Sequence, residues 1–500
     1  MGIKRPRSGH DKAIVNVWQR EVGLLSTRNF AHRLVASEDL VLKFDILRKL
    51  EKHRGCVNTV SFNESGDILV SGSDDRKVIL WDWEIGHAKL SFHSGHVHNV
   101  FQAKFMPYSY SDDCSLVTCA ADGQVRHAQI SEGGRVETFL LGTHESQAHK
   151  LVIEPGSPHI FYSCGEDALV QHFDLRTKDA TKLFTCRSTP ERRYGIRLKV
   201  SLNAIAIDPR SPNLFGVGGS DEFARVYDIR KCKEDGLTAS DQPINYYCPV
   251  QLLGDNSLNI TGLAFSDQSE LLVSYSDEHI YLFSKYMGWG QNPVSSSPLS
   301  TSSDFDEFGY DNATEASKSV LDTEIKSVPQ VYKGHLNQVT IKGVSFFGPK
   351  SEYVVSGSDC GRIFIWRKKD GVLIRVMEAD KEVVNCIEAH PHTAVLASSG
   401  IENDVKIWTP KAEKRATLPA NINEVLISAP TFLFESDDSE FDEDDDLYTD
   451  SYDDDLYDDV DEVYGYDDDG DGDYIDDDNN DDDIDDDNNE DEDDIDDDNN

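Results

Sequence analysis

The sequence lacks long apolar runs, paired cysteine motifs and the loops with which enzymes hold phosphates or activate a serine. No apolar stretch approaches the ~18–20 residues of a membrane span, and the first residues contain no apolar core of a secretory signal. The nine cysteines include no CxxC pair of the kind that binds structural zinc. We therefore expect reduced thiols, no cofactor, no membrane partner and a location in nucleus and cytoplasm.

Basic residues are also missing from the C-terminal part. From Glu435 to Asn500 there are 39 acidic residues and no Lys or Arg. The preceding 434 residues hold the other 54 acidic residues and all 48 basic ones, so their net charge is only −6. Residues 435–500 repeat the string IDDDNN and have too few apolar residues for a core, which predicts a disordered Asp-rich tail. Such a tail would attract basic proteins diffusely.

One part of the tail resembles a calcium-binding loop. Asp467, Asp469, Asp471 and Gly472 match the first half of an EF-hand loop, but Asp478 stands where that loop has a Glu. No helical apolar pattern flanks the match. We predict no specific metal site there.

Internal repeats are the strongest signal in the remaining sequence. The first repeat, His53 to Asp82, contains three short alternating segments separated by Gly, Ser and Asp turns. Further units begin at Gly95, near His149, at Asn203, Ile260, Gly334 and Val383. These units resemble WD repeats, whose period is about 40–45 residues. The count predicts an all-β, seven-bladed WD-repeat β-propeller over residues 41–420, in which circular closure removes exposed sheet edges.

The segments outside the repeats have different predicted roles. Residues 1–40 contain two short helical stretches, Ile14–Val22 and Thr27–Val35, and we expect Val41–Leu50 to supply the outermost strand of the last blade. The Ser-rich acidic stretch 287–330 predicts a disordered insertion between the fifth and sixth repeats.

Four polar and aromatic residues of the first repeat, His53, Ser71, Asp75 and Trp81, occupy positions at which WD repeats place a buried hydrogen-bond network. A His, Ser and Asp set can also form a catalytic triad. However, this set lies at repeat spacing, and no G-x-S-x-G elbow accompanies it. We interpret the four residues as structural.

The sixth repeat departs from this pattern. It keeps His335 and Trp366 but has Cys360 at the position of Asp75. Because a buried histidine needs a hydrogen-bond partner, we expect the neighbouring Asp359 to substitute.

Two consecutive repeats end in the same way, the third with Phe173, Asp174, Leu175 and Arg176 and the fourth with Tyr227, Asp228, Ile229 and Arg230. Strand alternation packs the aromatic residue inward and leaves the Asp and Arg at the rim. An arginine there offers a planar fork of donors for a carboxylate across an interface. The alternative is that each arginine only pairs with the Asp of its own blade.

These endings resemble the WDxR box by which WD-repeat proteins dock on the damage-binding-protein adaptor of cullin-4 ligases, with Phe or Tyr in place of Trp. Strings such as Ser71–Asp75, Ser94–His96, Asp122–Arg126 and Val354–Gly361 make residues 41–410 similar to the cullin-4-associated factors. The resemblance implies a non-catalytic substrate receptor of a cullin-4 RING ubiquitin ligase that docks on the adaptor and presents a protein substrate. It does not identify that substrate.

Receptors of this family often add an N-terminal helical element that inserts into the adaptor, and residues 1–40 look like such an element. Trp18 and Phe30 would then be its apolar anchors, since large aromatic residues tend to carry interface energy. The alternative is a leader packed loosely beneath the ring.

Basic clusters are few. Lys4–Arg7 has the composition of a nuclear-import signal. The stretch Arg187–Lys199 lacks the aromatic interleaving of a base-stacking surface, so we expect a solvated loop and no specific nucleic acid. The alternative function is a WD-repeat scaffold or acidic chaperone for basic proteins such as histones; an enzyme is the least supported reading.

Overall fold

The computed structural model describes residues 9–107, 114–131, 133–189, 197–232, 242–255, 257–291, 293 and 328–418. These residues belong to one compact unit, Met1–Phe432, and the second unit, Leu433–Asn500, lies outside them. Lys4–Arg7 and most of the stretch 287–330 also lie outside. Within the described ranges, no helix is long and apolar enough to cross a membrane.

The strands of the described ranges form seven antiparallel sheets of four strands, which we call blades 1 to 7. Blade 1 contains β2 (Val57–Phe62), β3 (Leu69–Ser73), β4 (Lys77–Asp82) and β5 (His87–His93); blade 2 contains β6 (Val100–Phe105), β7 (Cys114–Ala120), β8 (Gln124–Ile130) and β9 (Val136–Thr143). Blade 3 contains β10 (Ala148–Ile153), β11 (Ile160–Gly165), β12 (Leu169–Asp174) and β13 (Asp179–Thr185); blade 4 contains β14 (Leu202–Ile207), β15 (Leu214–Gly219), β16 (Ala224–Asp228) and β17 (Asn245–Tyr247).

The remaining blades follow the same order. Blade 5 contains β18 (Ile260–Phe265), β19 (Leu271–Tyr275), β20 (Ile280–Phe283) and β21 (Gln330–Tyr332); blade 6 contains β22 (Val344–Phe347), β23 (Tyr353–Ser356), β24 (Arg362–Arg367) and β25 (Leu373–Glu378). Blade 7 contains β26 (Val384–Ala389), β27 (Leu396–Gly400), β28 (Asp404–Thr409) and, as its outermost strand, β1 (Asp45–Glu51). Short 3-10 helices are η1 (Ile229–Lys231), η2 (Val250–Leu252) and η3 (Lys285–Met287).

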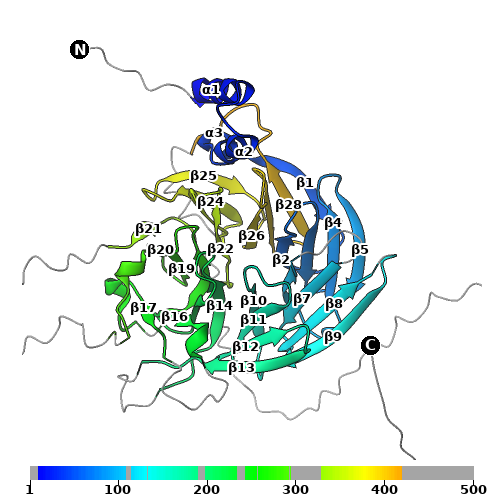
Figure 1. Cartoon of the computed structure of the whole chain (residues 1–500), viewed down its shortest axis with the longest axis vertical. Helices are drawn as coiled ribbons and strands as arrows, with labels where there is room; N and C mark the ends of the chain where they lie inside the picture. Colours follow the sequence, from blue (N-terminus) through cyan, green and yellow to red (C-terminus); the bar gives the residue numbers. More distant parts are fainter. Residues whose placement is uncertain are drawn as a thin grey trace, which may run out of the picture. The chain divides into compact units, whose positions relative to one another are not determined.

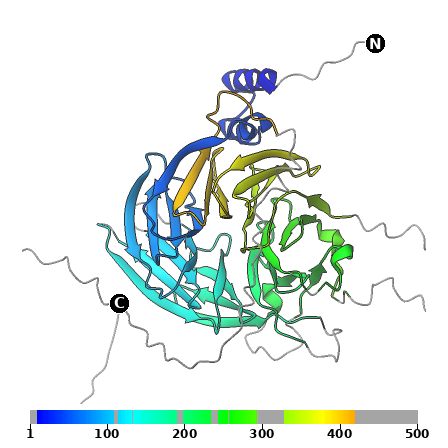
Figure 2. The same cartoon turned by 180° about the vertical axis from the view of Figure 1, so that it is seen from behind.

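The blades are arranged in a ring, as Figures 1 and 2 show from opposite sides. The first strands of successive blades contact one another around the ring, and β26 contacts β2, so the circle closes. The N-terminal strand β1 completes blade 7 by pairing with β28, from Asp45 opposite Thr409 to Glu51 opposite Asp404. The predicted seven-bladed propeller and its closure by an N-terminal strand are confirmed.

Two predicted boundaries were wrong. The closing strand begins at Asp45, because Val41 ends a short helix, α3 (Glu38–Val41), whose first turn holds Glu38 and Asp39, as the positive end of a helix favours. The stretch 287–330 interrupts blade 5 instead of separating it from blade 6, since β21 pairs with β20. A three-residue strand this far from its partner leaves almost no periodic signal in the sequence.

Two longer helices precede the ring, α1 (Gly9–Glu21) and α2 (Thr27–Val35). The hydroxyl of Ser26 caps α2 by accepting a hydrogen bond from the backbone N–H of Asn29. In Figures 1 and 2 both helices lie outside the ring, beside blades 6 and 7.

The hydrophobic core lies between neighbouring blades. Trp81 and Ile79 of blade 1, for example, share a buried cluster with Val405 and Ile407 of blade 7. Each blade therefore buries both faces of its sheet against its neighbours. This packing holds the strand ends, where the candidate functional residues lie, in fixed positions.

Candidate functional site

The strand directions define two faces of the ring. We call the face at which first strands begin and second strands end the upper face; in blade 1 it contains Val57 and Ser73. We call the face at which third strands end the lower face; in blade 1 it contains Asp82. The His53 network therefore lies toward the upper face, whereas Arg176 and Arg230 lie on the lower face.

The structure brings His53, Ser71, Asp75 and Trp81 together in one buried chain of hydrogen bonds. Nδ1 of His53 lies 3.0 Å from Oδ2 of Asp75, and Nε2 lies 2.7 Å from the hydroxyl of Ser71. The indole N–H of Trp81 donates to the same hydroxyl over 2.8 Å. All hydrogen-bonding groups of the imidazole are thus engaged within the blade, as a structural role requires.

Blades 2 and 3 contain the histidine, hydroxyl and Asp part of this network without the indole, and the sequence analysis assigned these residues only in the first repeat. His96 contacts Asp122 and Thr118, and His144 contacts Asp167 and Ser163, in each case within 3.1 Å. The third network uses His144 and not His149, near which the third repeat is predicted to begin. The separation of His and Asp, 22, 26 and 23 residues in blades 1 to 3, is the signal that would have found all three.

Blade 4 replaces the histidine with an arginine. Arg225 is fully buried and pairs through both terminal nitrogens with Asp221, while its guanidinium lies 5.5 Å from the ring centroid of Tyr246. Burial alone would lower the pKa of Arg225, but the negative charge of Asp221 has the larger effect and raises that pKa well above its usual value. The guanidinium of Arg225 therefore stays ionised in the interior of the blade.

Blade 7 uses a lysine for the same purpose. The ammonium of the buried Lys406 donates to Asp380 over 2.6 Å, to Glu402 over 2.7 Å and also to Asp404. The three carboxylates are close enough together to hold a metal ion. The ammonium already lies among them and offsets one of their three charges, so it occupies the position that a metal ion would take.

Blade 6 differs from the expectation. Asp359 pairs with the buried ammonium of Lys342 and accepts hydrogen bonds from the backbone N–H groups of Gln338 and Val339, so it does not substitute at His335. The imidazole of His335 has no hydrogen-bond partner among the described residues and packs edge-on against Trp366. Burial lowers the pKa of His335 to about 3, which keeps the ring neutral.

The two predicted boxes on the lower face share one geometry. Phe173 and Tyr227 are 1% exposed and plug the core. Nε and Nη2 of Arg176 donate to the two oxygens of Asp174 over 2.9 and 2.6 Å, and those of Arg230 donate to Asp228 over 2.9 and 2.8 Å. The hydrogen bonds from Arg176 lower the pKa of Asp174 to about 2. Both pairs are ionised at neutral pH.

These ion pairs leave the arginines accessible. The side chains of Arg176 and Arg230 are 62% and 67% exposed, whereas those of Asp174 and Asp228 are 17% and 8% exposed. Each carboxylate thus holds one edge of a guanidinium against the rim. The predicted alternative, in which each arginine pairs with the Asp of its own blade, is therefore what the isolated chain contains. The same ion pair fixes the direction of the exposed guanidinium, which lowers the entropic cost of binding a partner.

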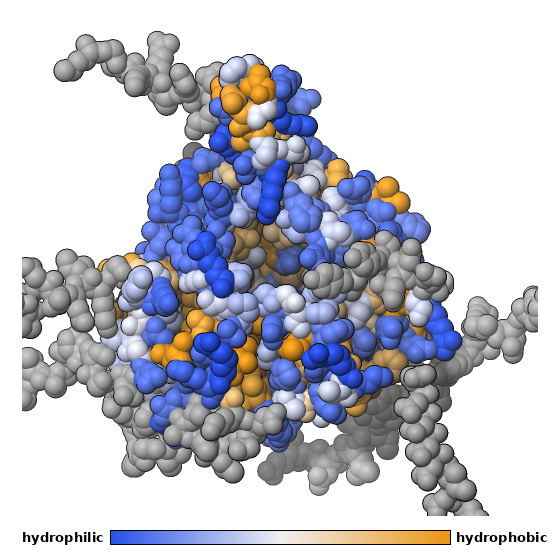
Figure 3. Space-filling model, in the orientation of Figure 1, coloured by the Kyte–Doolittle hydropathy of each residue, from blue (hydrophilic) through white to orange (hydrophobic). Residues whose placement is uncertain are grey.

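The N-terminal helices present an apolar surface. Trp18 is 55% exposed, and Ile14, Val17 and Leu24 are exposed near it in the sequence. Figure 3 shows apolar atoms gathered over α1 and α2. Phe30 is only half-buried, with the guanidinium of Arg20 5.1 Å above its ring, so it also contributes to the packing of α1 on α2.

The helices are anchored toward the same face as the boxes. The hydroxyl of Tyr353 donates to the backbone oxygen of Ala36 over 3.0 Å, and Arg367, at the lower end of β24, pairs with Glu38 over 2.8 Å. The sequence predicts Trp18 as an anchor but not its aliphatic neighbours Ile14 and Leu24. Ile14 precedes Trp18 by four residues on α1, and this helical spacing was the available signal, whereas Leu24 follows the end of α1 at Glu21.

Comparison with known proteins agrees with this architecture. Residues 44–82, 326–367 and 371–409 match the family model "WD domain, G-beta repeat". The chain is 33% identical over 279 residues to Protein ALTERED SEED GERMINATION 2 of Arabidopsis thaliana, which covers 50% of this chain and 37% of that protein. It is 30% identical over 275 residues to DDB1- and CUL4-associated factor 6 of Mus musculus, which covers 54% of this chain and 31% of that protein.

A longer but more distant alignment extends to human WD and tetratricopeptide repeats protein 1, with 23% identity over 611 residues, 79% of this chain and 88% of that protein. The chain spans about a third of the length of the first two relatives. The matched repeats agree with the WD-repeat propeller, and the relatives include proteins named as a DDB1- and CUL4-associated factor.

Proposed function

We propose that this WD-repeat propeller is a substrate receptor, and a non-catalytic subunit, of a cullin-4 RING ubiquitin ligase. Its lower face docks on the damage-binding-protein adaptor and its upper face recruits a protein for ubiquitination. Within the cullin-4-associated factors we propose a receptor of the factor 8 type, because the strings quoted from the repeats resemble that protein across the seven blades. The cell compartments we propose are the nucleus and the cytoplasm.

The observation that carries the proposal is the matched pair of exposed arginines on adjacent blades. Arg176 and Arg230 follow the third strands of blades 3 and 4, and an Asp of the same blade holds each one in a fixed direction. A planar guanidinium held in this way suits a bidentate contact with a carboxylate or backbone carbonyl of a partner. A single arginine of this kind would be an ordinary member of an ion pair at the rim. Two of them on adjacent blades offer a partner two equivalent contacts.

The helices α1 and α2 provide a second contact of different chemistry. Their anchoring near Arg367 places them toward the lower face, where a partner that engages the arginines would also meet the apolar surface around Trp18. Exposed aromatic and aliphatic residues that are buried on binding commonly dominate interface energy. The alternative, a scaffold for basic proteins, depends on residues 435–500, which lie outside the described ranges.

The test is co-purification of the adaptor with the full chain from cell extract. The double variant Arg176→Ala/Arg230→Ala should recover at least about tenfold less adaptor, since removing charged contacts from an interface leaves their partners unpaired. Arg135→Ala is a matched control, because Arg135 is also an exposed lower-face arginine and its guanidinium pairs with Glu137 two residues away over 2.9 Å.

The thermal midpoint of the double variant should stay close to that of the wild type, since both arginines are exposed. Unchanged adaptor recovery by a folded double variant would overturn the proposal. An equal loss of adaptor recovery with Arg135→Ala would show that the effect comes from general surface charge and not from Arg176 and Arg230. Trp18→Ala should separately weaken recovery while leaving the ring intact, because its side chain lies outside the blades.

A further inference from the structure

The upper face carries a concentration of like charge where blades 3 and 4 meet. After β13 and before β14 the chain forms a short antiparallel bridge in which Arg187 lies opposite Lys199. The backbone N–H of Ser188 donates to the oxygen of Leu198 over 2.8 Å, and that of Val200 donates to Cys186 over 3.2 Å. These bonds flank the bridge, so Arg187 and Lys199 are a non-hydrogen-bonded pair, the arrangement that brings opposite Cα atoms to about 4.5 Å.

This arrangement has an energetic cost within the protein. Like charges directly opposite each other destabilise an antiparallel pair. Arg197 lies two residues before Lys199 and is exposed, so the same short segment carries a third cation. Among the described residues, an ion pair reaches these cations only between Lys199 and Glu145, at 3.9 Å with both side chains more than half exposed. Such a contact contributes little.

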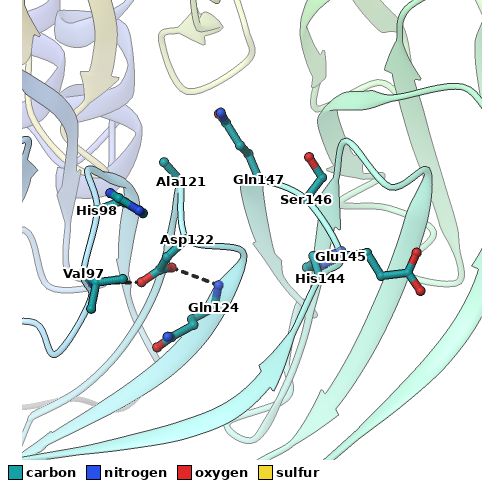
Figure 4. Close-up of a pocket in the computed structure, with 9 residues that line it drawn as sticks. All are labelled: Val97, His98, Ala121, Asp122, Gln124, His144, Glu145, Ser146 and Gln147. Atoms are coloured by element: carbon teal, nitrogen blue, oxygen red, sulfur yellow. Dashed lines mark hydrogen bonds between the residues drawn. The ribbon is translucent and has the colours of Figure 1, made fainter. Parts of the chain in front are cut away.

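A cavity lies next to this basic bridge, the name we use for Arg187, Arg197 and Lys199. Its volume is 390 Å³, and it opens between the upper ends of blades 2 and 3. In Figure 4 the side chains of Asp122 and Gln124 from blade 2 lie across from the segment Glu145–Gln147 that leads into blade 3. Val97, 58% exposed, supplies an apolar wall, and Glu145 links the cavity to Lys199.

We propose that the basic bridge and the adjoining cavity bind an extended acidic segment of a partner protein, with an apolar side chain of that segment against Val97. The proposal deepens the proposed function by naming the chemistry of the recruited segment, and it rests on that function for the role of the segment as a substrate. The partner's carboxylates supply the countercharge that Arg187 and Arg197 otherwise lack among the described residues.

A peptide fits this surface better than a nucleic acid does. A continuous phosphate backbone would place negative charge against Glu145 on the wall of the cavity, whereas a peptide can space its carboxylates to meet only the cations. The cavity wall and the bridge also expose apolar side chains, Val97 and Leu198, which suit a protein partner. The surface lies on the opposite face from Arg176 and Arg230, so both partners could bind at once.

The probe is a short fluorescein-labelled peptide of Asp and Glu around one central Leu, titrated with the full chain and followed by fluorescence anisotropy. Arg187→Glu places a carboxylate opposite Lys199, which should weaken peptide binding about tenfold or more. The same change should maintain or raise the thermal midpoint, because it turns a repulsive pair into an attractive one. Loss of binding without loss of stability separates a binding role from a folding role.

Arg135→Glu, with the same change of net charge on the lower face, is the matched control and should leave peptide affinity within about twofold. Equal weakening by both variants, no binding of the peptide by the wild type, or tighter binding of single-stranded poly-uridine RNA would each overturn the inference. Arg187→Glu should retain the adaptor, and Arg176→Ala/Arg230→Ala should retain the peptide. A failure of the docking proposal is thereby distinguished from a failure of this one.

Discussion

Blades 1 to 3 pair the carboxylate that precedes their third strand with a histidine, whereas blades 4 and 7 pair it with a buried cation. In the first group, Asp75, Asp122 and Asp167 each accept hydrogen bonds from a histidine of the same blade. In the second group, Asp221 and Glu402 each lie seven residues before the end of the third strand, as Asp75 and Asp167 do, but they face a buried cation, Arg225 or Lys406. One repeat architecture thus tolerates two solutions.

The difference predicts how each blade responds to damage. Burial lowers the pKa of His96 more than Asp122 raises it, which favours the neutral imidazole in this network. In blade 4 both partners are charged, and removal of one leaves the other desolvated and uncompensated. The histidine networks should therefore fail by losing hydrogen bonds, and the cation blades by exposing a buried charge.

The largest expected effect is in blade 4. Arg225→Leu removes the partner of Asp221 from a fully buried site and should lower the free energy of unfolding by about 3–5 kcal/mol, measured by urea denaturation. Arg225→Leu/Asp221→Leu replaces the whole ion pair with apolar groups and should recover most of that loss. A double variant as unstable as the single one would mean that the packing of Arg225 against Tyr246, and not its charge, stabilises the blade.

An intermediate effect is expected in blade 1. Ser71→Ala leaves both the indole N–H of Trp81 and Nε2 of His53 without a partner, which should cost about 1–3 kcal/mol. In blade 3 the corresponding Ser163→Ala removes a contact to His144 alone, since Phe173 has no donor, so its cost should be smaller. Urea denaturation of the two variants side by side measures the difference. Equal costs would show that the Trp81 bond adds nothing to the network.

How far the sequence could predict this comparison depends on the residue type. The first-repeat network was predictable because His, Ser, Asp and Trp stand at familiar repeat positions, and the bounds of α2, Thr27–Val35, agree with its sequence periodicity. Arg225 and Lys406 were missed because charged strand residues usually point to solvent. Both occupy the inward position that Ile79 fills in blade 1, and a cation at an inward position was the signal.

The candidate docking face was predictable to a different degree. Strand direction alone places Arg176 and Arg230 on one face, because both follow third strands of adjacent repeats. The sequence shows the basic stretch Arg187–Lys199, but the pairing of Arg187 with Lys199 was not predictable, since the two residues lie twelve positions apart. Three-dimensional pairing, and not composition, makes that cluster unusual.

The smallest expected effect is a dependence on acid that is specific to the histidine blades. Burial would raise the pKa of Asp75, but hydrogen bonds from His53 and from the backbone N–H groups of Arg54 and Lys77 prevail and lower it from 3.8 to about 2. A carboxylate whose pKa falls on folding stabilises the folded state above its unfolded pKa, and that contribution disappears as pH falls through the folded value. The stability difference between wild type and Asp75→Asn should therefore be constant from about pH 7 to 5 and shrink between about pH 4 and 2.

Urea midpoints of both proteins across this pH range measure the difference. Asp167→Asn in blade 3 should behave in the same way, since hydrogen bonds from His144 outweigh the effect of burial on the pKa of Asp167 too. A difference that persists unchanged to pH 3 would show that the ionised carboxylate is not what the histidine network recognises.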